Sequence, residues 1–159
     1  LPGIPRANYM PFPFQIVQDT DFMFFAYEFA HASRTVHMNS PDSDIPFDAW
    51  MGHSKGHWEG DTLVVETTNY INGFRGSTPN VRLTERYTRA SEDFINWEIT
   101  VDDPATWAQS WTLMVRLKRA SGQLYEYACH EGNYSMAGML AGARRAEQKA
   151  AEAAAKSAR

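Results

Sequence analysis

The segment WMGHSKGHWEGDTLVVETTN, residues 50–69, decides the fold class. Residues 50–59 and 62–68 are two short runs with aromatic and β-branched side chains, and Gly60 and Asp61 separate them. Two such runs joined by a turn that contains Gly and Asp are typical of a β-hairpin. We therefore predict a pair of antiparallel strands in this part of the chain.

Further strand signals lie on both sides of the hairpin. Near the start of the chain, Phe12, Phe14 and Ile16 alternate with Pro13 and Gln15, which is typical of an edge strand. Other short runs with strand character occupy residues 22–29, 32–38, 81–90, 94–102, 111–117 and 124–131. We predict a mainly β fold, an antiparallel meander of eight or nine strands that closes into a lipocalin-like barrel. A two-sheet β-sandwich is the alternative.

The two ends of the chain have a different character from the middle. Prolines at positions 2, 5, 11 and 13 predict an extended arm over residues 1–21, within a barrel domain of residues 1–133. Residues 134–159 are rich in alanine and predict a helix, with one apolar face formed by Met136, Met139, Leu140 and Ala143. Such a helix buries little by itself, so we expect it to join a homo-oligomer or a larger complex.

Composition and charge exclude several classes of protein. The 159 residues carry a net charge of −4, so a nucleic-acid partner is not expected. No run approaches the roughly 18–20 apolar residues of a transmembrane segment. The single cysteine, Cys129, rules out an internal disulfide framework, and its aromatic neighbours indicate a buried, inert thiol.

The aromatic content of 13% points to a ligand. A barrel of about eight strands holds one small molecule in its interior, and apolar walls with a few polar groups are typical of such sites. We predict a cavity for a hydrophobic or aromatic small molecule, although the same rings would also fill a core. The candidate ligand-binding residues are Trp50, Trp58, Tyr27, Tyr87, Arg34 and Tyr127. An accessory or structural subunit, docking through its N-terminal arm and C-terminal helix, is the alternative function.

Four residues are candidates for general acid–base catalysis: His53, His57, Glu66 and Glu85. A histidine titrates near neutral pH, and a neighbouring carboxylate orients it. Across the hairpin, His57 and Glu66 would form such a pair and support a lyase, isomerase or hydrolase reaction. Whether the protein is an enzyme stays open, because the histidines equally suit a strand rim and Glu66 an ion pair with Arg82, Arg86 or Arg34.

The hairpin does not predict a cofactor. In a regular strand His53 and His57 lie about 13 Å apart, which is too far to share a metal. Zinc or another divalent metal would need Gly52 and Gly56 to bend the strand until both histidines meet Glu66. Residues 52–56 also match the Gly-x-Ser-x-Gly pattern, but a hairpin follows them rather than the helix that a nucleophile elbow requires.

Three motifs carry a resemblance. Residues 50–69, the run LYEYACHEGN at residues 124–133 and the opening LPGIPR together resemble a widespread family of uncharacterised bacterial proteins. The resemblance implies a longer precursor with an export signal, and hence a periplasmic or secreted protein; without it, a cytoplasmic one is expected. The start at Leu1 accordingly suggests a processed or truncated end. A cysteine that often precedes the Leu-Pro-Gly start in that family is absent here. Gly56-His57-Trp58 is similar to the Gly-x-Trp motif of lipocalins, which lies on their first strand.

Overall fold

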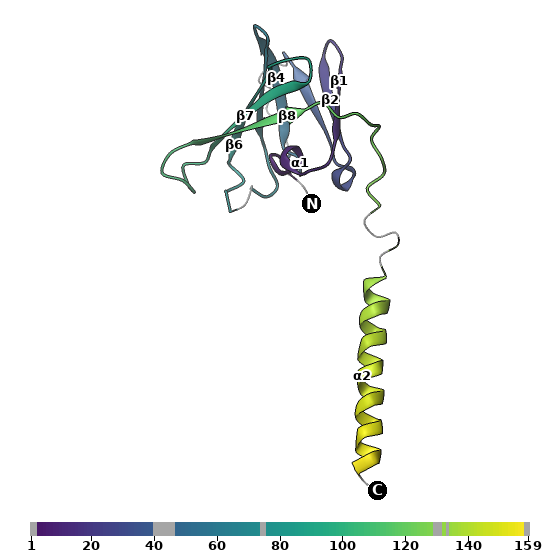
Figure 1. Ribbon diagram of the computed structural model, residues 1–159. Coiled ribbons are helices and arrows are strands. Elements are labelled where there is room, and N and C mark those ends of the chain that lie inside the picture. Colours follow the sequence, from purple (N-terminus) through teal and green to yellow (C-terminus); the bar gives the residue numbers. More distant parts are fainter. Residues whose placement is uncertain (1–2, 40–46, 74–75, 129–131, 133, 158–159) are drawn as a thin grey trace. The chain divides into compact units, whose positions relative to one another are not determined.

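The computed structural model describes residues 3–39, 47–73, 76–128, 132 and 134–157 (Figure 1). It divides into two compact units, Leu1–Tyr127 and Ala128–Arg159. The first unit contains all the strands, and the second contains the long helix. The sequence-based boundary at residue 133 lies a few residues beyond this division.

The first unit is built on one eight-stranded sheet whose strands follow chain order (Figure 1). The sheet curls into a half-barrel, with β1 and β8 as its two edges. The predicted mainly β, barrel-like meander is therefore confirmed, whereas the two-sheet sandwich is not found. The strands are β1 Phe14–Gln18, β2 Phe22–Tyr27, β3 Ser33–Met38, β4 His53–Glu59, β5 Thr62–Thr68, β6 Arg82–Arg89, β7 Phe94–Asp102 and β8 Trp111–Lys118.

One pair of strands departs from the antiparallel pattern. Strands β3 and β4 run parallel, with Val36 opposite Ser54 and Met38 opposite Gly56. Parallel neighbours need a connection of about a dozen residues or more, and residues 39–52 are long enough to return the chain to the starting end of the sheet. The sequence analysis predicted antiparallel neighbours throughout, because strand patterns carry no information about the direction in which the chain re-enters the sheet.

The hairpin predicted from residues 50–69 is present as β4 and β5. Ser54 pairs with Thr67 and Gly56 with Val65, so these residues share the inner face of the sheet. Gly56 leaves space for β3, since a Cβ atom there would lie 2.7 Å from Cγ1 of Val36. Cβ contacts that short are not found in proteins, so close packing of the two strands depends on glycine.

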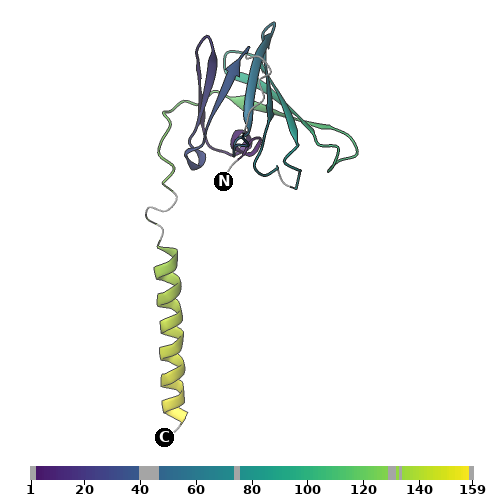
Figure 2. The same cartoon turned by 180° about the vertical axis from the view of Figure 1, so that it is seen from behind.

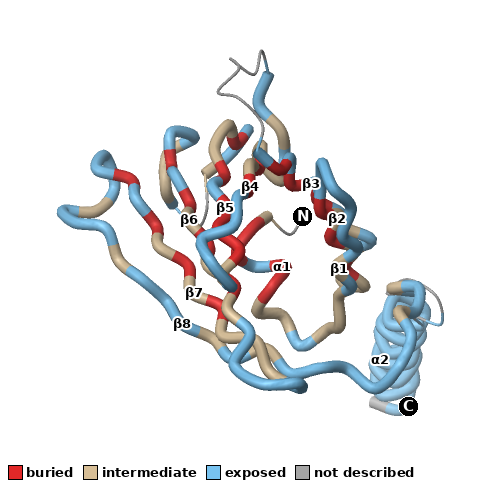
Figure 3. The backbone as a smooth tube through the Cα atoms, turned by 90° about the horizontal axis from the view of Figure 1, so that it is seen from above, coloured by how far each residue is buried: buried red, intermediate tan, exposed pale blue. Residues whose placement is uncertain are grey.

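The sequence analysis predicts an extended N-terminal arm over residues 1–21, but part of this segment is helical. Arg6–Tyr9 form the short helix α1, which lies within the curve of the sheet, where Ile4 and Ala7 join the hydrophobic core (Figure 3). Four residues are too few for a helix that is stable by propensity, so packing holds this turn. The prolines at 2, 5, 11 and 13 lie outside these four residues and therefore do not prevent them from forming a helical turn.

The last predicted strand is not formed over residues 124–128, and residues 129–131 lie outside the described part. The backbone of this segment bonds instead to the turn after β2, which contains the short 3-10 helix η1, Phe29–His31. The Tyr125 amide donates to Glu28 at 3.0 Å, and the Tyr127 carbonyl lies 3.2 Å from the His31 ring.

The predicted C-terminal helix is confirmed as α2, Ser135–Ser157 (Figure 2). Its described side chains are exposed, including the apolar Met136, Met139 and Leu140. Among the described residues, no helix is both long enough and apolar enough to span a membrane.

Candidate functional site

Polar side chains meet inside the half-barrel in what we call the buried polar cluster: Asn8, Tyr27, Arg34, Glu85, Tyr87 and Trp97. Alternation along β6 turns Glu85 to the interior with Leu83 and Tyr87, and the Glu85 side chain is completely buried. Arg34 on β3 forms an ion pair with Glu85.

The Glu85 carboxylate is held by donors from three strands. Besides Arg34, the Trp97 indole donates to Oε1 at 3.0 Å and the Tyr87 hydroxyl donates to the same oxygen at 2.6 Å. Burying a charge is strongly unfavourable unless an opposite charge and hydrogen bonds compensate for it. Glu85 meets these conditions, which favours a structural ion pair over a general base.

Asn8 connects helix α1 to the cluster. Its amide nitrogen donates to the Tyr87 hydroxyl at 2.6 Å, and its carbonyl accepts from the Tyr27 hydroxyl at 2.8 Å. Because Asn8 uses both ends of its amide, the short helix is fixed to β2 and β6 by hydrogen bonds as well as by packing.

The electrostatics of the cluster keep its tyrosines neutral. Burial raises the pKa of Tyr27 and of Tyr87 well above the usual value, and the Glu85 carboxylate raises both further. Burial opposes the charge of Arg34, yet the Glu85 carboxylate and the two phenols outweigh it, so the Arg34 pKa is also raised. At neutral pH Arg34 is therefore charged and the two phenols are neutral hydrogen-bond donors.

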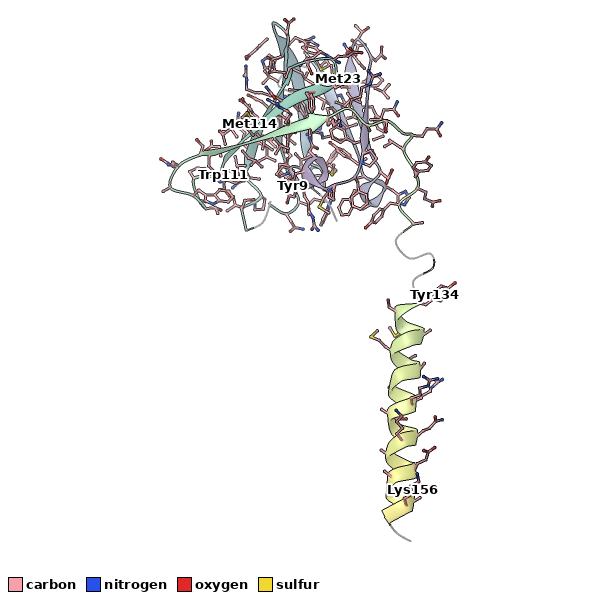
Figure 4. All side chains as sticks on the ribbon, viewed as in Figure 1. Tyr9, Met23, Trp111, Met114, Tyr134 and Lys156 are labelled. Carbon is pink, nitrogen blue, oxygen red and sulfur yellow. The ribbon has the colours of Figure 1, made fainter. Side chains whose placement is uncertain are left out.

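A groove of about 1270 Å³ runs between the two edges of the sheet. Its walls include the apolar side chains of Phe14 and Ile16 on β1 and of Val115 and Leu117 on β8. Tyr9 of α1, labelled in Figure 4, and Asn8 also line the groove, so it touches one member of the buried polar cluster. The open groove therefore exists because β1 and β8 do not pair.

The charged residues that line the groove are predominantly basic: Arg89, Arg116, Lys118 and Arg119 against Glu92 and Asp93. The chain as a whole has a net charge of −4, so this excess of cations is local. Arg116 lies over the Phe94 ring, with its Cζ atom 5.7 Å from the ring centroid. The groove thus combines apolar walls with a basic border.

The structure brings four of the predicted site residues together. Tyr27, Arg34, Glu85 and Tyr87 all belong to the buried polar cluster. Tyr27 does not contact the groove directly but is hydrogen-bonded to Asn8, which does.

The other predicted aromatic residues lie elsewhere. Tyr127 packs against Phe12 and Phe29, with ring centroids 5.2 and 5.3 Å away. Trp50 is 40% exposed in the loop before β4, and Trp58 is 47% exposed near the end of that strand. Tyr127, Trp50 and Trp58 are therefore not among the residues that line the groove, although Phe12, which contacts Tyr127, is.

The predicted pair of His57 and Glu66 is not formed. The register of the hairpin places His57 opposite Val64, and Glu66 opposite Lys55. Alternation turns both side chains to the outer face, where His57 lies 3.3 Å from Glu59 and Glu66 lies 3.8 Å from Arg82.

His53 also faces outward and stacks on the ring of His37, with centroids 5.0 Å apart. Partial burial lowers the pKa of His53, and the neighbouring His37 and Lys55 lower it further. Within the described ranges, no three His, Cys, Asp or Glu side chains are close enough together to hold a metal ion.

The residues that the sequence analysis missed are Asn8 and the two walls of the groove. The walls carry a readable signal, since Phe14, Ile16, Val115 and Leu117 alternate with polar neighbours along their strands. Asn8 has no comparable signal, because its role depends on partners 19 and 79 residues away.

Comparison of the chain with protein-family models found no match. Searches of curated proteins and of solved structures likewise found none that is similar to it.

Proposed function

We propose that this protein binds a small apolar or aromatic molecule in the groove between β1 and β8. The observation that carries the proposal is the groove itself, a space of about 1270 Å³ walled by apolar side chains from both edges of the sheet. Removing such walls from water is favourable by about 25 cal/mol for each Å² of apolar surface. An apolar occupant would therefore be stabilised where β1 and β8 fail to pair.

Binding is favoured over catalysis. The described residues that line the groove include no histidine, and the predicted pair of His57 and Glu66 lies on the outer face of the sheet. Glu85, which is buried nearby, already accepts from Arg34, Tyr87 and Trp97. These positions supply no acid–base pair to a molecule in the groove.

A charge placed in the wall of the groove is expected to weaken binding. Val115→Asp should weaken binding of the neutral dye N-phenyl-1-naphthylamine by at least about tenfold, because the ligand would desolvate a carboxylate. Met114→Asp is the matched control, since Met114 is the preceding residue of β8 and is 65% exposed. Dye fluorescence titrations of the three proteins measure the effect.

A second substitution at the same position distinguishes loss of binding from loss of folding in that experiment. Val115→Trp fills the groove with an apolar ring and adds no charge, and we expect it to weaken dye binding as well. Thermal unfolding of each variant confirms that it is folded. Wild-type affinity in both Val115 variants would contradict the proposal.

A role as an accessory subunit is the second candidate, and α2 favours it. Met136, Met139 and Leu140 are 65, 63 and 51% exposed, although they form one face of the helix. An exposed apolar face of this kind suits packing against a partner or a second copy of the chain.

Replacing two residues of that face with charge tests this role. If α2 mediates self-association, wild-type protein will show a concentration-dependent mass in sedimentation equilibrium, and Met139→Glu with Leu140→Glu will be monomeric. Ala141→Glu with Gln148→Glu, which also adds two charges to α2 but on the opposite side of the helix, is the control. A monomeric wild type would point to a different partner and exclude the homo-oligomer.

A further inference from the structure

The inner face of the sheet carries two arginines at one end of the groove. Residues Arg89, Ile95 and Leu117 are aligned across β6, β7 and β8, since Arg89 pairs with Ile95 and Ile95 with Leu117. The Arg119 amide donates to the Asp93 carbonyl at 2.8 Å, which continues the β7–β8 ladder by one step. By alternation, Arg119 then shares the inner face with Leu117.

Both arginines converge on one residue of the turn after β6. Arg89 donates to the backbone carbonyl of Glu92 at 3.2 Å, and an Arg119 nitrogen lies 3.8 Å from the Glu92 carboxylate. The Arg119 and Glu92 side chains are 67 and 87% exposed, and ion pairs that are so exposed contribute little stability. The Glu92 carboxylate is therefore held only weakly by Arg119, and Arg89 contacts the backbone of the same residue.

The other cations at the border of the groove lie on the opposite face. Arg116 and Lys118 alternate with the inward Val115 and Leu117, and Arg116 stacks on Phe94. Of the four cations at the border, Arg89 and Arg119 are thus the two on the inner face, and the acidic Glu92 and Asp93 line the same end of the groove. From there the apolar walls of Ile95, Leu117 and Ile16 continue along the groove.

We infer that the ligand of the groove is an elongated apolar molecule with a carboxylate at one end, and that Arg89 and Arg119 bind this carboxylate. The inference rests on the proposed function and adds the chemical class and orientation of the ligand. Guanidinium groups match carboxylates in charge and geometry, and the apolar chain would lie along the inner walls of β1 and β8.

Displacement of a neutral dye by two matched ligands tests the inference. Lauric acid and dodecanol have the same chain length and differ in the charge of the head group. We expect displacement of N-phenyl-1-naphthylamine from the wild type to give lauric acid an affinity about fivefold to tenfold higher than that of dodecanol. The difference is modest because both charge contacts are exposed to solvent. That preference should decrease as the salt concentration rises.

Substitution of the arginines assigns the preference to this end of the groove. Arg89→Gln with Arg119→Gln should reduce the preference to less than about twofold, by weakening the binding of lauric acid much more than that of dodecanol. Arg116→Gln, which removes a cation from the outer face of β8, should keep the full preference. Glu92→Gln should increase it, because the competing carboxylate is lost.

The outcomes separate the two proposals. If the dye does not bind to the wild type, the proposed function fails. If the dye binds but lauric acid has no advantage over dodecanol, or the advantage survives in Arg89→Gln with Arg119→Gln, only the inference is overturned. Arg89→Lys with Arg119→Lys retains both charges and should keep most of the preference, which excludes misfolding as the cause.

Discussion

Replacing Glu85 with leucine should lower the free energy of unfolding by about 3–5 kcal/mol, because it leaves the buried Arg34 guanidinium without its counter-charge. The Tyr87 and Trp97 donors lose their acceptor at the same time. A single domain is stable by only about 5–15 kcal/mol, so this variant will be close to unfolding at room temperature. Urea denaturation followed by tryptophan fluorescence measures the change.

Glu66→Gln is the matched control for this experiment. Glu66 lies on the neighbouring strand and also pairs with an arginine, but both side chains of that pair are at least half exposed. Its loss should change the free energy of unfolding by less than about 1 kcal/mol. Glu85→Leu combined with Arg34→Met removes both buried charges and should recover part of the lost stability. Equal midpoints for Glu85→Leu and wild type would refute a structural role for the cluster.

The protein should also lose stability steeply above pH 10. Burial raises the pKa of Tyr27, Tyr70 and Tyr87 far above the ordinary value of 10.0, and the Glu85 charge adds to each. Below pH 10 both the folded and the unfolded chain keep these phenol protons. Above it only the unfolded chain releases them, so the free energy of unfolding falls by about 1.4 kcal/mol per pH unit for each phenol.

Tyr70 allows this effect to be separated from packing. Its hydroxyl lies near Thr67 but makes no hydrogen bond of acceptable geometry with any described residue. Tyr70→Phe should therefore be about as stable as the wild type at pH 7 or slightly more stable. It should reduce the slope above pH 10 by about a third, because one of three phenols is gone. Urea denaturation at several pH values provides the slopes, and an unchanged slope would contradict the prediction.

The sequence predicted the parts of this structure that depend on neighbouring residues. Alternation with a period of two places Glu85 inside with Leu83 and Tyr87, and the structure confirms it. The same alternation places Glu66 on the face of Val64, with Leu63 and Val65 on the other. Side-chain direction along a strand is a local property, so one strand is enough to read it.

What the sequence did not predict depends on distant partners. Arg34 was one of three candidate partners for Glu66, which lies instead near Arg82. The curl of the sheet brings Arg34 to Glu85, 51 residues along the chain. The groove arises because β1 and β8 do not meet, which no single strand reveals. The expected pairing of His57 with Glu66 was wrong for a related reason, since a shift of two residues in the hairpin register separates them.

The two unpaired edges of the sheet have a consequence for solubility. Edge strands present backbone N–H and C=O groups to which a strand from another molecule can add. Here β1 has only five residues and follows Pro11 and Pro13, while β8 carries Arg116 and Lys118, and all of these features discourage such addition. A molecule seated between the edges would block both of them, so occupied protein should aggregate more slowly than empty protein.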